Sequence, residues 1–174
     1  MTSEFQPPYV PLPDLHGALK SHGFALLSAH AVGEWLGASA ADMAALHAGW
    51  DRLPADAYLK DGGRYRSRRH SCFVVNGTRV EQSPHRAHWQ PLEYNALHGG
   101  MQRWFEPMEP DVVALPVWNH LLTRLGEAAS ALRGEQPWYV EAHPFRIDTT
   151  DGIGRPTPEG AHRDGVDLVA VALV

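Results

Sequence analysis

The chain has little cysteine and no long hydrophobic segment. Cys72 is the only cysteine in 174 residues, which excludes an intrachain disulfide and a cysteine-based zinc cluster. No apolar run approaches the length of a membrane span. The N-terminus also lacks the basic segment followed by an apolar one that marks a signal peptide. We therefore expect a soluble protein of the cytoplasm.

Several functional signatures are also missing. The sequence has no glycine-rich phosphate loop in a strand-turn-helix context, and no serine or cysteine nucleophile motif. The net charge of −5 argues against general affinity for nucleic acid. The composition thus favours neither nucleic acid nor a membrane as a partner.

What the chain does contain is enough apolar material for a real core. Hydrophobic residues make up 44% of the sequence, and six of its residues are tryptophan. A chain of this length suits one domain, and we expect residues 1–174 to form a single one. We expect helices and strands in residues 1–136 to cover the first core strands in residues 137–174.

The segment Pro156–Val174 carries the clearest chemical signal. It opens with a proline-rich turn, presents His162 and Asp164 two positions apart, and becomes fully apolar from Leu168 onward. Alternate residues of an extended strand share a face and lie about 6.6 Å apart along the backbone. An imidazole and a carboxylate at this spacing can bind one metal ion, as in the facial triad of non-haem Fe(II) oxygenases. A solvated loop whose histidine caps a turn is the alternative interpretation.

Four short blocks of sequence resemble one known family. They are Pro158–Asp167, His143–Ile147, Arg64–Arg69 and Gly99–Arg103, and together they span about residues 55–174. Their order and spacing are similar to those of the 2-oxoglutarate/Fe(II) dioxygenase family that includes bacterial isoleucine hydroxylases and the BsmA proteins. The resemblance implies a double-stranded β-helix (a cupin-like jelly roll), Fe(II), 2-oxoglutarate as cosubstrate, and hydroxylation or sulfoxidation of free amino acids.

The same resemblance predicts a missing ligand. Family members continue well past the His-x-Asp strand, and the third iron ligand and the basic residue that binds 2-oxoglutarate would lie beyond Val174. We therefore expect a chain truncated at its C-terminus, with an incomplete barrel, an α+β fold and its N-terminal helices packed outside. The truncated chain alone would be inactive.

Periodicity predicts the elements around this segment. Trp138–Asp148 alternates as a strand, with Tyr139, Glu141 and His143 on one face. We expect it to share one antiparallel sheet with Asp164–Val174. An apolar stripe predicts a helix over Asp111–Leu132 that backs this sheet.

Arginines dominate another predicted strand, from Arg64 to Val75, where Arg64, Arg66 and Arg68 share a face. That face is either simply solvated or a clamp for carboxylates, which guanidinium groups bind through two hydrogen bonds. A nucleic-acid site would need a wider basic surface. With His143 and Arg146, which lie in blocks matching the family, Arg66 is a candidate for the wall of the substrate or cosubstrate cleft.

The histidines of the loop-rich stretch from Val80 to Met108 carry a weaker signal. Loop histidines such as His85, His88 and His98 can be metal ligands, but the segment from His85 to His88 lacks a nearby carboxylate or cysteine that would complete a site. We therefore interpret them as surface or packed residues.

The predicted function is an Fe(II)/2-oxoglutarate dioxygenase that acts on an amino-acid-like small molecule. Two alternatives stay open. One is a non-catalytic, cupin-type protein that binds a metal or small ligand with the same two residues and loop histidines. The other is an inactive remnant or interaction protein. The sequence specifies neither the substrate nor the oligomeric state.

Overall fold

A computed structural model describes residues 7–59, 64–95, 99–150, 152, 154 and 164–173 of the chain. The described elements, in order, are a 3-10 turn η1 (Leu12–Asp14), α1 (Leu15–His22), α2 (Ala29–Leu36), α3 (Ala40–His47), η2 (Trp50–Arg52), β1 (Arg66–Arg68), β2 (Ser71–Asn76), β3 (Arg79–Gln82), α4 (Pro110–Val113), α5 (Pro116–Arg133), β4 (Trp138–Ala142) and β5 (Phe145–Ile147). Within these ranges no helix combines the length and the apolarity needed to cross a membrane.

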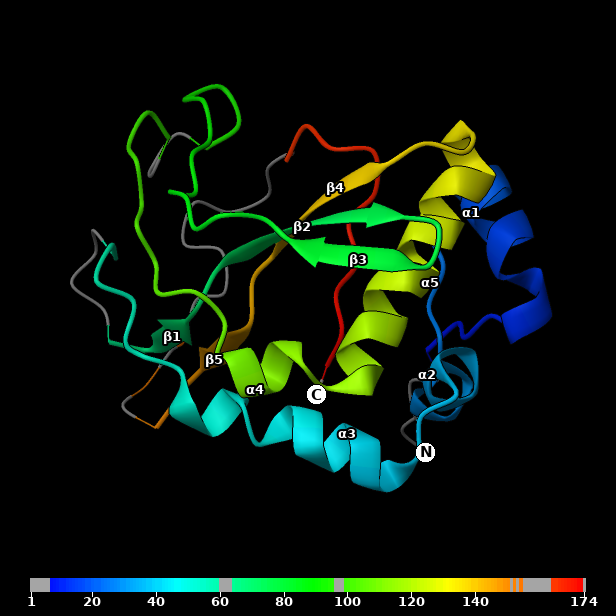
Figure 1. Ribbon diagram of the computed structural model, residues 1–174, viewed down its shortest axis with the longest axis horizontal. Helices are drawn as coiled ribbons and strands as arrows, with labels where there is room; N and C mark the ends of the chain where they lie inside the picture. The colour runs from blue at the N-terminus through cyan, green and yellow to red at the C-terminus, as the bar shows by residue number, and fades with distance from the viewer. Residues whose placement is uncertain are drawn as a thin grey trace, which may run out of the picture.

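The strands form two antiparallel sheets. One has the order β3-β2-β4 and the other pairs β1 with β5, so the described strands do not close into a barrel (Figure 1). This α+β arrangement of helices around antiparallel strands agrees with the fold class predicted from the sequence.

The helices cover the three-stranded sheet through α5. The ring of Phe73 on β2 is fully buried and lies 5.7 Å from the ring of Trp118 on α5. Val75 and Leu122 complete the centre of this core. The helix α5 runs along the sheet with α1, α2 and α3 at its sides (Figure 1). The apolar stripe predicted for this helix is thus confirmed at Trp118 and Leu122, although Pro116 separates α4 from α5.

Both long predicted strands change sheets at the same place. β1 and β2 are separated at Arg69 and His70, and β4 and β5 are separated at His143 and Pro144. The amide of Arg69 donates to the carbonyl of Pro144 at 3.2 Å, so the two breaks are adjacent. Proline has no N–H to continue a ladder, which explains why the strand predicted over Trp138–Asp148 is divided into β4 and β5 at Pro144.

The prediction of a strand over Asp164–Val174 was also wrong for the residues that the structure describes. Residues 164–173 adopt no regular structure, and the side chains of Val171 and Leu173 are 85% and 97% exposed. A strand requires a hydrogen-bonded neighbour, and none of the described strands pairs with this segment. The apolar composition alone was therefore misleading.

Two helical glycines provide a test of the packing. A Cβ atom built on Gly126 of α5 would lie 2.8 Å from Cγ1 of Val75, whereas nothing lies within 4 Å of a Cβ on Gly17 of α1. We expect Gly126→Leu to lower the free energy of unfolding by about 1–3 kcal/mol through overpacking. Gly17→Ala should raise it by about 0.4–1 kcal/mol. Denaturant titration of both variants checks this, and equal effects would contradict the described packing of α5.

Candidate metal centre

Three histidines and one carboxylate meet where the sheets separate. His70 lies between β1 and β2, His143 follows β4, Glu141 is on β4, and His88 belongs to an extended segment that pairs with Arg103. The β2–β4 register aligns Ser71 with Ala142, which brings the neighbouring His70 and His143 together. Their rings stack with centroids 4.8 Å apart. Non-local strand pairing therefore assembles this histidine–glutamate cluster.

The histidine nitrogens converge on one oxygen. Oε2 of Glu141 lies 2.8 Å from Nδ1 of His88, 3.7 Å from Nε2 of His143 and 3.8 Å from Nε2 of His70. One potential ligand atom from each residue lies within 4.8 Å of all the others. Imidazole and carboxylate are the donor types that hold zinc and non-haem iron. The arrangement is thus a candidate site for a divalent cation.

The surroundings keep two of these rings neutral. Burial lowers the pKa of His70 to about 4, although Glu141 opposes the shift. Burial likewise lowers the pKa of His143 to about 3. Burial alone would raise the pKa of Glu141, but hydrogen bonds from His143 and His88 outweigh it and hold that pKa well below its usual range. Near neutral pH the cluster therefore contains an ionised carboxylate and the neutral imidazoles of His70 and His143, the forms that bind metals.

Arg68 fixes the tautomer of His143. Its guanidinium donates to Nδ1 of His143 at 2.7 Å and lies over the rings of Phe105 and Phe145. Because arginine can only donate, Nδ1 must carry the lone pair, and the proton of the neutral ring sits on Nε2. That N–H faces Glu141. His143 therefore presents its N–H to the carboxylate, with 3.7 Å between its Nε2 and Oε2 of Glu141.

A second polar network holds Asp164. Oε1 of Gln90 accepts hydrogen bonds from Arg103 and from Asn95, each at 3.0 Å. The amide nitrogen of Gln90 therefore points away from these two donors. That nitrogen donates to Oδ1 of Asp164 at 3.2 Å. Asn95 and Arg103 are 2% and 3% exposed. The carboxylate of Asp164 is thus oriented by a buried support.

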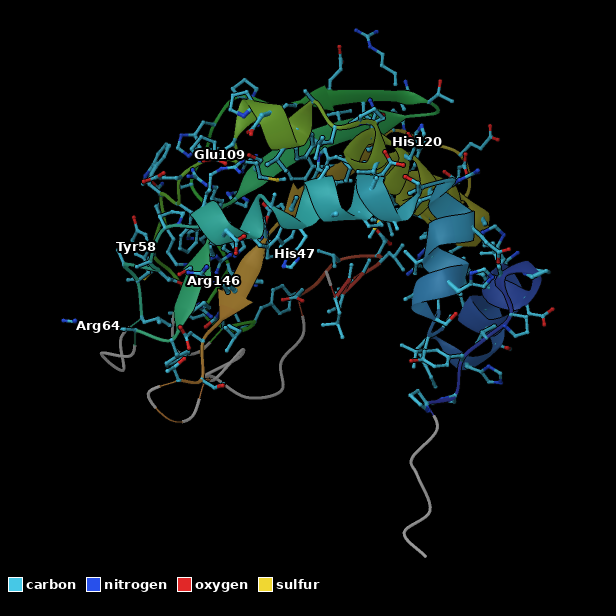
Figure 2. The ribbon with its side chains drawn as sticks, turned by 90° about the horizontal axis from the view of Figure 1, so that it is seen from below. His47, Tyr58, Arg64, Glu109, His120 and Arg146 are labelled. Carbon is cyan, nitrogen blue, oxygen red and sulfur yellow. The ribbon has the colours of Figure 1, made fainter. Side chains whose placement is uncertain are left out.

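The other residues singled out from the sequence are dispersed. His162 lies outside the described residues. Arg66 is buried and forms an ion pair with Asp56, with Nε and Nη2 both 2.7 Å from Oδ2. Arg146 is exposed on β5 and lies with Arg64 at the β1–β5 end of the molecule (Figure 2). Of the candidate cleft residues, only His143 joins the cluster.

Sequence reasoning missed most of the cluster. His88 was interpreted as a surface or packed residue because no carboxylate is near it in the sequence, yet its partner Glu141 is 53 positions away. The one available signal was the Glu141-x-His143 spacing, which puts both side chains on one strand face just as the His162-x-Asp164 spacing would. The predicted shared face of Glu141 and His143 is confirmed.

A comparison with protein families shows to which family this chain belongs. The family model described as 2OG-Fe dioxygenase matches residues 47–174. The chain belongs to the 2OG-Fe dioxygenase family. Its residues 47–174 thus include the His162-x-Asp164 segment as well as the histidine–glutamate cluster. No curated protein matches the chain significantly.

Solved structures support the membership. A BsmA homologue from Methylobium petroleophilum PM1 is 48% identical, with a TM-score of 0.83 over 91% of this chain and 64% of that chain. IDO from Bacillus thuringiensis is 13% identical, with a TM-score of 0.54 over 81% of this chain and 57% of that one, which indicates the fold alone. This 2OG-Fe dioxygenase chain thus spans less than two thirds of either structure, and its two open sheets are consistent with an incomplete jelly roll.

Proposed function

We propose that this protein is an Fe(II)- and 2-oxoglutarate-dependent dioxygenase that hydroxylates or sulfoxidises a free amino acid or a similar small molecule. The observation that carries the proposal is the family match over residues 47–174, which includes His162 and Asp164. We propose these two residues as iron ligands, with a third protein ligand supplied from beyond Val174. A family of Fe(II) and 2-oxoglutarate enzymes implies both cofactors.

The described part of the site fits such an ion. Carboxylate and imidazole are suitable donors for non-haem iron. The Gln90 amide fixes the direction of the Asp164 carboxylate, and Arg103 and Asn95 fix the amide in turn. Hydrogen bonds of this kind commonly orient metal ligands and set their basicity.

When bound, iron and 2-oxoglutarate supply the oxidising chemistry, and the chain supplies placement. The amide of Gln90 holds one oxygen of Asp164 and so fixes the direction of this carboxylate. Among the proposed cleft residues, the exposed guanidinium of Arg146 is suited to attract a carboxylate of the substrate or cosubstrate. Because Arg66 is already paired with Asp56, Arg146 is the better candidate for this role.

Removing either proposed ligand tests the function. We expect His162→Ala and Asp164→Ala to lower 2-oxoglutarate-dependent succinate formation by more than about 100-fold, since losing a ligand should exceed the effect of losing a residue that orients one. The assay uses the natural gene product, including any residues that follow Val174, with Fe(II) and a panel of free amino acids. Asp167→Ala is a matched control because its carboxylate pairs with Arg133 at 3.1 Å.

The outcome separates the proposed alternatives. Wild-type rates in both ligand variants would show that iron is held elsewhere. An absence of succinate under all conditions, together with cation binding, would instead favour a non-catalytic metal-binding protein.

A further inference from the structure

We propose that His70, His88 and Glu141 form a second cation site, suited to a zinc-like divalent ion, with His143 as the residue that positions the carboxylate. This site uses none of the residues proposed for iron. It would hold the junction of the two sheets together and leave a fourth position for water. The proposal does not depend on the dioxygenase function.

The spacing of the ligand atoms matches such an ion. Ligands bound at about 2.1 Å in tetrahedral geometry lie about 3.4 Å from one another. The Glu141 oxygen is 2.8 Å from the His88 nitrogen and 3.8 Å from the His70 nitrogen, on either side of that value. Small side-chain rotations would therefore place all three atoms around one ion.

His70 provides an independent observation. Its side chain is 1% exposed, yet its Nδ1 has no hydrogen-bond partner among the described residues. The contacts of its Nε2 are the long one to Glu141 and one of 3.5 Å to the sulfur of Cys72. Buried polar rings normally make short hydrogen bonds, and an exception in a native protein calls for a water or an ion. Among the described residues, neither nitrogen of this buried ring makes a short hydrogen bond, and a cation on Nε2 would give the ring one strong partner while Nδ1 donates to a water.

The roles of His143 and Cys72 follow from their own contacts. The donor Arg68 occupies Nδ1 of His143, so its Nε2 carries a proton and cannot bind a cation without losing it. It can donate to the carboxylate or to a water on the cation instead. The sulfur of Cys72 lies 3.5 Å from Nε2 of His70, but it is not among the ligand atoms that lie within 4.8 Å of one another. His88 also donates from Nδ1 to Glu141, so its proton must move to Nε2 before Nδ1 can bind the cation. With His88 in that tautomer, two imidazoles and one carboxylate remain, with one open position.

Cation titration tests the proposal. In the double variant His162→Ala/Asp164→Ala, which lacks the proposed iron ligands, we expect one Zn²⁺ to bind per chain by calorimetry in chelator-free buffer, and one Co²⁺ to give the visible absorption of a four-coordinate site. His70→Asn, His88→Asn and Glu141→Gln should each weaken binding by more than about 100-fold, and His143→Asn by about 10–100-fold, as removal of an orienting residue does. Circular dichroism without metal verifies that each variant folds.

Two controls make the result decisive. His85→Asn removes a nearby exposed histidine whose Nε2 contacts the carbonyl of Phe105, and it should leave cation affinity unchanged. The double variant His162→Ala/Asp164→Ala should also retain the Zn²⁺ site, whether or not it forms succinate. Loss of binding in that double variant, or wild-type affinity in folded Glu141→Gln, would overturn the second site. Neither result would bear on the proposed dioxygenase activity, which succinate formation tests separately.

Discussion

Arg66→Met is expected to lower the free energy of unfolding by about 3–5 kcal/mol, because it leaves a buried carboxylate without its counter-charge. The side chains of Arg66 and Asp56 are 5% and 0% exposed, and two guanidinium nitrogens lie 2.7 Å from the same carboxylate oxygen. The backbone supports the pair, since the amide of Asp56 donates to the carbonyl of Arg66 at 2.9 Å. Equilibrium denaturation in urea measures the loss.

Two further variants separate charge from shape. Arg64→Met changes an exposed arginine two positions earlier, and we expect an effect within about 0.5 kcal/mol. The double variant Asp56→Leu/Arg66→Met removes both charges and should recover much of the loss, since a buried ion pair can often be replaced by apolar side chains. If Arg66→Met were as stable as Arg64→Met, the buried pair would not contribute to stability.

The helices were the most accessible part of the fold because their signals are local. Ser39 and Asp42 are three positions apart, and they form the reciprocal capping box that starts α3. Gly23 and Gly134, at the ends of α1 and α5, have positive φ values of 77° and 93°, which glycine adopts without strain. Such features depend on residues within one or two turns, so a single sequence contains them.

The points at which the chain passes from one sheet to the other could not be predicted from local signals. Alternation predicts that a segment is extended, but it does not identify the strand that lies beside it. The breaks at His70 and Pro144 lie together only because β2 pairs with β4 across more than sixty residues of sequence. The metal cluster has the same origin: the shared face of Glu141 and His143 was predicted, whereas the approach of His88 depends on long-range pairing.

Arginine burial shows the same limit. The sequence placed Arg66 and Arg68 correctly on one face, and both are 4% exposed. Whether that face meets water or protein depends on Asp56 and on the rings of Phe105 and Phe145, which come from distant parts of the chain. The solvated basic face was one of two interpretations that the periodicity allowed, and the packing contradicts it at Arg66 and Arg68, whereas Arg64 is exposed.

Acid is expected to destabilise the metal-free chain well before most carboxylates titrate. The pKa values of His70 and His143 are lowered to about 4 and about 3, mainly by burial, from an unfolded value near 6.5. Between these limits the unfolded chain binds more protons than the folded one, so the free energy of unfolding falls as pH decreases. The stability that the chain has with both rings neutral is fully present above about pH 6.5, and it is lost progressively as the pH falls toward 4. The depressed pKa of Glu141 adds a loss of the same sign below about pH 4.5.

The measurement is a series of urea titrations from pH 7.5 to 4.5 in the presence of a chelator, which keeps metal binding out of the comparison. We expect a total loss on the order of several kcal/mol. His70→Asn should flatten the slope because the group that resists protonation is gone, while Asn119→Gln, which changes an exposed residue of α5 that does not titrate, should keep the wild-type slope. The His143 ring is next to Arg68, whose positive charge also opposes its protonation, so His143→Asn should flatten the slope as well. If the free energy of unfolding of the unmodified chain did not change with pH, the two imidazoles would gain protons as readily in the folded state as in the unfolded one. That result would contradict the lowered pKa values of His70 and His143.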